Sequence, residues 1–376
     1  MSDSLHVGVD ALNLLHDRRG IWRYANALLR RFMSMGSERV RVTLLVPHAL
    51  PRLVARPLAR ALDCNAVIVR RRRDAAGLGL HIVWYPWNGM TWLSPCRNIA
   101  TVHDVWPFAS PAEDLRKRRS EQTPFRTTAA NAKVIITDSQ FSKTEIVKHL
   151  AVSPQNVRVV ALGVDPVPPD SEQPLLLDGA SRYVLFVGES EPRKDLATLQ
   201  DAMTKLPDAL RMTTGFVIAG TPRGSTSSRG RVDSQRHEGK QSTVLRFEPV
   251  DGVPTLVTGS IGDALLHQLY GGAAAFVFPS RYEGFGLPVL EAMAHGAPVL
   301  ASNAASIPEV AGDAAVYFPA GNAGALAHEL TQILSDPILV VRLRTAGQSR
   351  AVTFTWDRCA EETLRVFEAV ASSERV

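Results

Sequence analysis

Short apolar runs alternate with amphipathic segments along most of this 376-residue chain. In the first half, the strand-length runs are "LHVGV", "RVTLLVP", "AVIV", "IVWYPW", "NIATVHDV" and "KVIITDS". Such alternation is typical of parallel sheets whose strands are joined by helices. The sequence therefore predicts an α/β fold.

The alternation stops once and then restarts, which predicts two domains. The interruption, Asp165 to Arg182, is rich in Pro, Asp and Ser and without periodicity, so we interpret it as a linker. Strand-like runs resume at "YVLFVG" and continue to "PVLAS". The chain also exceeds the size at which one hydrophobic core usually stops growing. We expect Rossmann-like domains at 1–168 and 169–354, with a terminal helix within 355–376 packed back on the first domain.

Ligands of open parallel sheets bind beyond the carboxyl ends of the strands, so we expect a cleft faced by both domains.

The N-terminal residues and the cysteine spacing indicate the cellular compartment and the state of the thiols. The first residues contain no basic leader, and no apolar run approaches the roughly 18 residues of a spanning helix, so we expect a cytoplasmic protein. Cys64, Cys96 and Cys359 are far apart and lack ligand spacing. Reduced core thiols are therefore expected rather than disulfides or zinc ligands.

Positive charge gathers in the first domain. Residues 1–170 contain 24 Lys and Arg against 14 Asp and Glu, whereas the remainder contains 18 against 23. The clusters Arg70–Arg73 and Arg116–Arg119 suit anionic lipid, nucleic acid or phosphorylated substrates, although each also fits a solvated surface. Four aromatic residues fit either an exposed acceptor site or a core: Trp84, Tyr85, Trp87 and Trp92. Peripheral contact with the inner face of the plasma membrane is one expectation.

Two further segments are interpreted as structure without chemistry. The polar stretch from Arg223 to Ser242 has no periodicity and is predicted to be a loop. In "SIPEVAG", Ser306 and Glu309 have capping-box spacing and Gly312 marks a helix stop. We expect that short helix to be scaffold.

The stretch "RYEGFGLPVLEAMAHG" contains the strongest chemical signal. It predicts a turn at Glu283 to Gly286 and a helix from Leu287, with Pro288 in its first turn. A helix N-terminus suits a diphosphate, and the flanking glycines let the backbone approach a ligand. Carboxylates accept hydrogen bonds from pairs of sugar hydroxyls, so we expect Glu283 and Glu291 to bind the hydroxyls of a ligand. The alternative is one glutamate that complements the helix dipole and one on the surface.

The pattern "E-GFG-PVLEA-A-G-PV-AS----PEV-G-AA--F" closely resembles the nucleotide-sugar signature of the family 4 retaining glycosyltransferases, which have the GT-B fold. Other stretches match in the expected order: "GIWRYANALL", "TVHDVWPF", "DSQFSKTEI", "LGVD", "YVLFVGESEPRKDL" and "FTWDRCAEETL". The resemblance covers nearly the whole chain, and ordered co-occurrence makes coincidence improbable. It implies transfer of a hexose from a nucleotide sugar with retention at the anomeric carbon.

The same resemblance implies roles for individual residues. Glu291 would bind the ribose hydroxyls of the donor, and Leu287 would meet the diphosphate. Glu283 would bind the transferred sugar together with three backbone N–H groups, those of Gly284, Phe285 and Gly286. In "EPRKD", Arg193 and Lys194 would hold the leaving diphosphate, because two cations stabilise its developing charge. His103 of "TVHDVW" would face the donor sugar and acceptor, and Gly20 would form the first glycine loop.

This chain departs from the family pattern at three places. Arg18 and Arg19 occupy the loop in which many relatives have a second glycine, and Glu189 with Ser190 replaces an arginine. The diphosphate clamp would therefore rest on Arg193 and Lys194. Asp195 replaces asparagine, a change that we expect to be neutral because both residues cap helices well.

Missing motifs exclude other chemistries. The sequence contains no DxD triplet, no GxxxxGK[ST] loop and no GxGxxG, so we expect no metal and no redox cofactor. The nucleotide sugar, GDP- or UDP-linked, would be a substrate.

The "GIWRY…HD…RK" subgroup resembles bacterial mannosyltransferases that extend polyprenyl-diphosphate-linked oligosaccharides for surface polysaccharide. GDP-mannose is the first expectation for the donor, and a UDP-hexose is the second.

Two other functions remain open from sequence. The pI of about 9.3 and the arginine clusters suit a non-enzymatic nucleic-acid-binding protein. Such a protein would leave Glu283 and Glu291 unexplained, and no RNA-binding or helix-turn-helix signature is present, so we expect no nucleic-acid partner. A sugar epimerase or phosphorylase on a similar scaffold is the third possibility.

Overall fold

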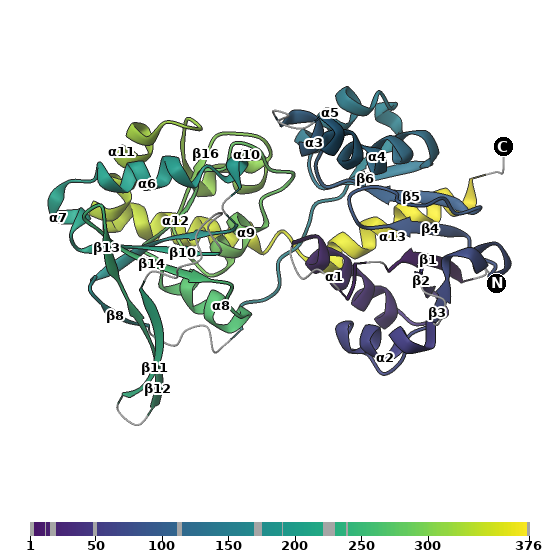
Figure 1. The fold of residues 1–376 in the computed structure, drawn as a ribbon, viewed down its shortest axis with the longest axis horizontal. Coiled ribbons are helices and arrows are strands. Elements are labelled where there is room, and N and C mark those ends of the chain that lie inside the picture. The colour runs from purple at the N-terminus through teal and green to yellow at the C-terminus, as the bar shows by residue number, and fades with distance from the viewer. Residues whose placement is uncertain are drawn as a thin grey trace. The chain divides into compact units, whose positions relative to one another are not determined.

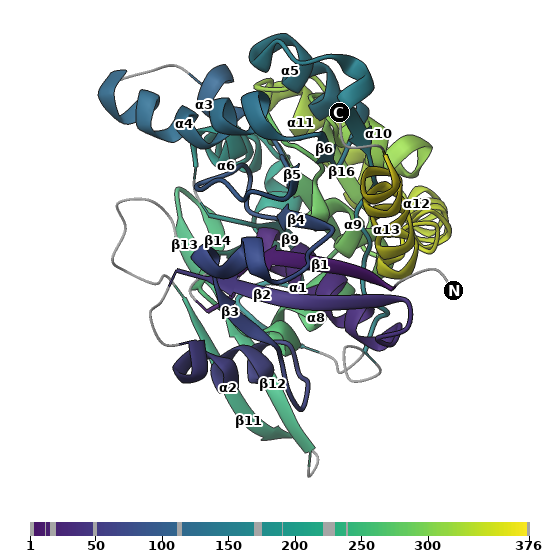
Figure 2. The ribbon, with the colours of Figure 1, turned by 90° about the vertical axis from the view of Figure 1, so that its right-hand side faces the viewer.

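The protein is described by a computed structural model that covers residues 4–11, 13–15, 20–47, 51–110, 115–168, 175–189, 191–220, 230–237 and 240–373. The chain forms two compact units. Unit 1 contains Met1–Gly163 and Phe354–Val376, and unit 2 contains Val164–Thr353. Figures 1 and 2 show a sheet flanked by helices in each unit.

Unit 1 is built on a parallel sheet in the order β3-β2-β1-β4-β5-β6-β7. Its strands are β1 (Leu5–Asp10), β2 (Val40–Val46), β3 (Val69–Arg71), β4 (Ile82–Tyr85), β5 (Arg97–Thr101), β6 (Val134–Thr137) and β7 (Val157–Val159). Its helices are α1 (Gly20–Ser34), α2 (Pro51–Ala61), η1 (Arg72–Gly77), α3 (Trp106–Ala109), α4 (Leu115–Asn131), α5 (Gln140–Leu150), η2 (Pro154–Asn156) and α13 (Trp356–Ser372). The strand order steps outward from β1 in both directions, which is the doubly wound arrangement.

Unit 2 repeats this architecture with the order β13-β14-β10-β9-β15-β16-β17, in which the edge strand β13 is antiparallel. Its main strands are β9 (Arg182–Val187), β10 (Thr214–Ala219), β13 (Glu248–Val250), β14 (Val253–Gly259), β15 (Ala275–Phe278), β16 (Val299–Ser302) and β17 (Ala315–Phe318). Its helices are η4 (Pro192–Lys194), α6 (Leu196–Thr204), α7 (Asp208–Arg211), α8 (Asp263–Gly272), α9 (Leu287–Ala294), α10 (Ile307–Ala311), η5 (Gly312–Ala314), α11 (Ala323–Ser335) and α12 (Pro337–Ala351). The α/β prediction is confirmed for both units.

The segment predicted to be a polar loop is partly a β-hairpin. β11 (Arg231–His237) pairs antiparallel with β12 (Lys240–Arg246), and β12 pairs with β8 (Leu176–Asp178), which lies in the predicted linker. Figure 1 shows this hairpin extending away from the main sheet of unit 2. The loop prediction failed because backbone pairing in a hairpin does not require an apolar face on both strands. The register pairs His237 with Lys240, and Glu238 and Gly239 between them lie outside the described residues. The part of the predicted loop before Gly230 lies outside the described residues.

The aromatic residues of β4 belong to the core of unit 1. Trp84 and Tyr85 are completely buried, which excludes the exposed acceptor-site role for these two. Their neighbours Trp87 and Trp92 are only half-buried. All three cysteines are free thiols, as expected, but the core position is confirmed only for Cys359 of α13, because Cys64 and Cys96 are half-buried.

Helix α13 packs on α1, β4 and β5, and its start comes very close to Gly163. A Cβ atom added at Gly163 would lie 2.2 Å from the backbone nitrogen of Trp356 and 2.4 Å from the carbonyl carbon of Thr355. Real side chains do not approach backbone atoms so closely, so only glycine fits at this position. The structure thus gives a packing reason for the glycine of "LGVD".

We predict that Gly163→Ala lowers the free energy of unfolding of the protein by about 1–3 kcal/mol, the usual range for overpacking. Gly77→Ala is the matched control, because an added Cβ there would meet no atom within 4 Å. Denaturant titration of both variants measures the effect. Equal stability of the two variants would show that α13 can shift away from Gly163.

Candidate active site

A serine hydroxyl holds the Gly-Phe-Gly turn of unit 2 in place. The Oγ atom of Ser306 donates to the carbonyl oxygens of Glu283 and Phe285, each at 2.9 Å. Gly286 has a φ of 103°, in the left-handed region that favours glycine, and is the N-cap of α9. The predicted capping box is wrong, because the side chain of Ser306 makes no cap hydrogen bond to α10. Ser306 therefore supports the turn rather than the helix that it precedes.

Glu283 is buried and paired with two cations from the turn after β9. The Nζ atom of Lys194 lies 2.6 Å from Oε1 of Glu283, and an Nη atom of Arg193 lies 3.3 Å from Oε2. The side chains are 8% exposed for Glu283, 12% for Lys194 and 18% for Arg193. Charges so poorly hydrated interact more strongly than surface ion pairs. The structure thus places three predicted site residues in one cluster.

Each cation of this cluster has a second contact. The Nζ atom of Lys194 lies 5.0 Å from the ring centroid of Phe278, over the face of the ring, which is a cation–π geometry. Nε of Arg193 also donates to Glu191 at 2.6 Å. Both cations are therefore fixed in position before any ligand arrives, which lowers the reorganisation that a negatively charged ligand requires.

Arg281 and Asp195, which sequence reasoning did not assign to the site, fix the cationic turn. The backbone N–H of Arg281 donates to the carbonyl oxygen of Arg193 at 2.7 Å, and its Nε donates to Oδ2 of Asp195 at 2.7 Å. Asp195 has a φ of 50°, which Asp and Asn tolerate better than most residues. Its carboxylate does not cap the α6 backbone, so the reason given for expecting a neutral Asp-for-Asn change is wrong. Asparagine would keep the backbone shape but lose the charge that pairs with Arg281.

Glu291 lies on α9, one helical turn after Leu287, the first residue of that helix. The hydroxyl of Tyr270 in α8 donates to Oε2 of Glu291 at 2.9 Å. Tyr270 is 1% exposed and was not identified from the sequence. Unit 2 thus brings together Arg193, Lys194, the Glu283 turn and the start of α9.

His103 belongs to unit 1 and both of its ring nitrogens have partners there. Nδ1 lies 2.7 Å from Oδ2 of Asp138, and Nε2 lies 3.3 Å from the carbonyl oxygen of Pro86. Its backbone is also held, because the N–H donates to Asn88 at 2.8 Å and Ser142 donates to the carbonyl oxygen at 2.9 Å. Since carboxylate and carbonyl oxygens both accept, this arrangement favours the doubly protonated ring.

We predict a raised pKa for His103. Burial, the largest single influence, lowers the pKa of the imidazole, but the charge and hydrogen bond of Asp138, the Pro86 carbonyl and the charge of Asp104 together raise it above 6.5. Protonation of His103 then contributes stability that is full below pH 6.5 and is lost as pH rises through the raised pKa. NMR titration of the ring should give a midpoint above 6.5, and Asp138→Asn should lower it. A wild-type midpoint below 6.5 would contradict the ion pair.

Gly20, predicted to form a glycine loop, is the exposed first residue of α1. Arg18, Arg19 and Ser190, noted as departures from the family pattern, lie outside the described residues. The roles of Gly20 and His103 toward a donor stay predictions.

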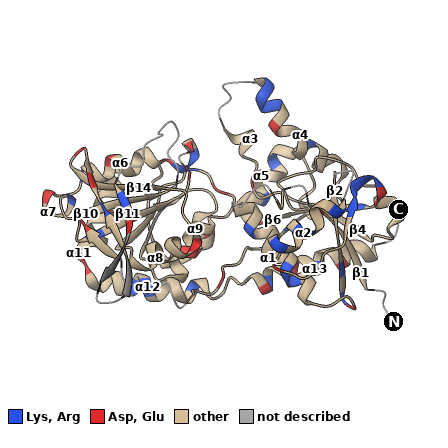
Figure 3. Ribbon diagram, turned by 60° about the horizontal axis from the view of Figure 1, so that its bottom comes forward, with Lys and Arg blue, Asp and Glu red and all other residues tan. Residues whose placement is uncertain are grey.

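The two arginine clusters of unit 1 differ in environment. In the first, Arg72 is mostly buried and pairs with Asp10 at 2.7 Å, whereas Arg73 is exposed. In the second, Arg116, Lys117 and Arg119 are exposed on α4, where Figure 3 shows a block of positive charge. Leu115, at the start of α4, is 68% exposed. Of the two clusters, the one on α4 is the more exposed basic surface among the described residues.

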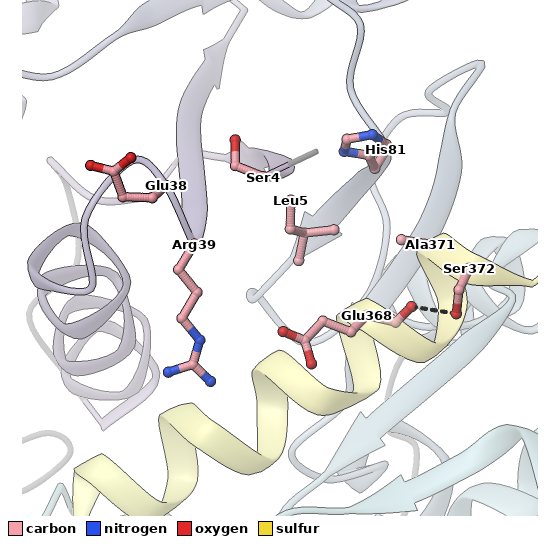
Figure 4. A pocket seen from close by; sticks show the side chains of 8 residues that line it. All are labelled: Ser4, Leu5, Glu38, Arg39, His81, Glu368, Ala371 and Ser372. Atoms are coloured by element: carbon pink, nitrogen blue, oxygen red, sulfur yellow. Dashed lines mark hydrogen bonds between the residues drawn. The ribbon is translucent and has the colours of Figure 1, made fainter. Parts of the chain in front are cut away.

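A hollow of about 570 Å³ in unit 1 is lined by none of the predicted site residues. It is lined by residues at the amino ends of the strands, including Leu5, Arg39 and His81, and by Glu368 of α13 (Figure 4). Ligands of parallel α/β sheets bind at the opposite, carboxyl ends of the strands, so this hollow carries no assignment. Among the described residues, no helix is long and apolar enough to cross a membrane, and no group of three His, Cys, Asp or Glu residues could hold a metal ion.

Two known families and several known proteins match this chain. The family "Glycosyltransferase Family 4" matches residues 18–167, and "Glycosyl transferases group 1" matches residues 169–350. The O-antigen chain mannosyltransferase B of Escherichia coli is 30% identical over 284 residues, which are 72% of this chain and 70% of that protein. The MMP alpha-(1->4)-mannosyltransferase of Mycolicibacterium hassiacum is 29% identical over 68% of this chain, and the match spans 56% of that relative.

The fold is similar to that of solved structures. The Anabaena protein HepE, in complex with UDP-glucose, aligns with a TM-score of 0.66 at 14% identity over 97% of this chain and 99% of that chain. The chain therefore belongs to the family 4 glycosyltransferases and is a glycosyltransferase of the GT-B fold.

Proposed function

We propose that the protein transfers a hexose from a nucleoside diphosphate sugar to a hydroxyl of a glycan or lipid-linked acceptor, with retention at the anomeric carbon and without a metal ion. The observation that carries the proposal is the cluster of Glu283, Arg193 and Lys194 beside the N-terminus of α9. Cations and a helix N-terminus suit a diphosphate, and a buried carboxylate suits sugar hydroxyls.

In the proposed reaction, the acceptor oxygen attacks the anomeric carbon from the face that the diphosphate leaves. The bond from that carbon to the phosphate oxygen breaks, the new glycosidic bond forms, and the acceptor proton passes to the leaving phosphate. Arg193 and Lys194 would stabilise the negative charge on the diphosphate, and Leu287 with the start of α9 would bind its oxygens. Metal is then unnecessary because protein cations supply the compensating charge.

The remaining site residues would orient the donor. Glu283, with the backbone N–H groups of Gly284, Phe285 and Gly286, would hold the transferred sugar, and Glu291 would accept from the ribose hydroxyls. His103, kept protonated by Asp138, would act as a fixed positive charge rather than as a base. Gly20 would let the first loop of unit 1 approach the donor.

Mannose from GDP-mannose is the donor that we propose, with a UDP-hexose as the second candidate. Two relatives are named as mannosyltransferases, one of them for O-antigen chains, which supports mannose and a surface polysaccharide acceptor. HepE was solved with UDP-glucose, which keeps the uridine donors open. The exposed cations and Leu115 of α4 would bring unit 1 to an anionic membrane on its cytoplasmic side.

The test is calorimetric binding of GDP-, UDP-, ADP- and TDP-sugars in the presence of EDTA, with Glu291→Ala alongside. We expect micromolar binding of GDP-mannose and a loss of about tenfold or more in Glu291→Ala, since a carboxylate that accepts from ribose is worth about 1.5–3 kcal/mol. Absence of binding throughout the panel would contradict the proposal. Binding that requires a divalent ion would contradict its metal-independent form.

A further inference from the structure

Helices α8 and α9 of unit 2 face each other with two matched pairs of side chains. Tyr270 and His267 are three residues apart on α8, and Glu291 and His295 are four residues apart at α9, so each pair lies on one helix face. α8 packs against α9, and both helices are labelled in Figure 1. Across this contact, Tyr270 meets Glu291 and His267 meets His295.

The contacts form one continuous chain. Nε2 of His295 lies 2.8 Å from Nδ1 of His267, and Nδ1 of His295 lies 2.8 Å from the carbonyl oxygen of Glu291. The nearly parallel rings of His267 and His295 have centroids 4.9 Å apart, and the ring of Tyr270 lies 5.4 Å from that of His295. Tyr270 thus holds the side chain of Glu291, His295 holds its backbone carbonyl, and His267 holds His295.

The geometry also fixes which nitrogen of a neutral His295 ring bears the hydrogen. A carbonyl oxygen only accepts, so Nδ1 of His295 bears a hydrogen and Nε2 of the neutral ring is an acceptor. His267 must then donate from its Nδ1. Each hydrogen bond in the chain has one donor and one acceptor, and the arrangement leaves Oε1 of Glu291 outside the Tyr270 contact.

We propose that Tyr270, His267 and His295 are positioning residues that orient the Glu291 carboxylate for the ribose hydroxyls of the nucleotide. The inference rests on the proposed function, because it takes Glu291 as the ribose-binding residue. Tyr270 restrains the rotation of the carboxylate. His295 stacks against Tyr270 and holds the α9 backbone at Glu291, and His267 holds His295 in place. Preorganisation of this kind lowers the entropy that a bidentate contact with two hydroxyls would otherwise lose.

The experiment compares GDP and UDP with their 2′,3′-dideoxy counterparts as calorimetric ligands of the full chain. For whichever base binds, we expect Tyr270→Phe and His295→Gln each to weaken the ribonucleotide by about 5- to 20-fold, consistent with a lost or misaligned bond to a charged group. The same variants should change binding of the dideoxynucleotide by less than about twofold, because that ligand cannot use Glu291.

Matched controls separate positioning from general stability. Tyr317→Phe removes another tyrosine hydroxyl in unit 2, one that donates to Gly312, and His328→Gln changes an exposed histidine of α11. Both should leave binding of the two ligands unchanged. Equal weakening of ribo- and dideoxynucleotide by Tyr270→Phe would overturn the inference, because the residue would then act on the fold alone.

The failure of the proposed function would look different. If Glu291→Ala does not reduce the preference of the protein for ribose over dideoxyribose, the ribose assignment itself is wrong. If Glu291→Ala removes that preference while Tyr270→Phe and His295→Gln keep it, only the positioning role is wrong. If neither GDP nor UDP binds the wild type, the proposed function falls and the inference falls with it.

Discussion

Lys194→Ala should lower kcat by about 10²- to 10³-fold, the usual loss when one group that stabilises developing negative charge is removed. Lys194 is 12% exposed, and its ammonium group is fixed between Glu283 and the ring of Phe278. The substitution leaves Arg193 as the remaining cation of the cluster. Turnover of a nucleotide sugar, measured as released nucleoside diphosphate, reports the loss.

The control for this prediction is Lys205→Ala, which removes an exposed lysine of the same unit. That variant should keep wild-type turnover. If Lys194→Ala also kept it, the assignment of the cation to the leaving diphosphate would be wrong, and the cluster would be a structural ion-pair network.

Glu283→Gln should reduce kcat by about 10²-fold or more and should also destabilise unit 2. The amide keeps the shape of the side chain but cannot balance the charges of Lys194 and Arg193, which are largely buried. Removing one partner of a buried pair costs about 3–5 kcal/mol, and partial exposure of the cations should reduce this to about 1–3 kcal/mol. Initial rates and denaturant titration measure the two effects separately.

Glu248→Gln, at an exposed position of β13, is the control for charge removal in unit 2. It should alter neither activity nor stability measurably, because isolated surface charges contribute little. A stable, fully active Glu283→Gln protein would contradict both the role of Glu283 at the transferred sugar and the energetic importance of its ion pairs.

The sequence predicted the architecture well because hydrophobic periodicity and glycine placement report directly on parallel α/β folds. It also identified the turn from Glu283 to Gly286 and the helix start at Leu287. The sequence-based predictions were wrong where contacts between distant residues decide the local structure. β11 became a strand through pairing with β12, and Ser306 turned toward the Glu283 turn although its local pattern was that of a helix cap.

The hydrogen-bond partners of His103 and Glu291 are distant in sequence and come close only in the folded chain, so residue spacing within one segment could not predict them. Asp138 is 35 residues from His103, and Tyr270 is 21 residues from Glu291. The sequence did contain a signal for the second pair. In "HQLY", His267 and Tyr270 lie on one helix face, and in "EAMAH", Glu291 and His295 do the same. Recognising it would have required knowledge that α8 packs on α9.

The most direct test of the account is an assay of sugar transfer from radiolabelled GDP-mannose to a polyprenyl-diphosphate-linked oligosaccharide acceptor, in EDTA, followed by NMR of the new glycosidic linkage. The account predicts acceptor-dependent release of GDP and a product with the same anomeric configuration as the donor. Transfer that proceeds with inverted configuration, or that occurs only when a divalent metal is added, would contradict it.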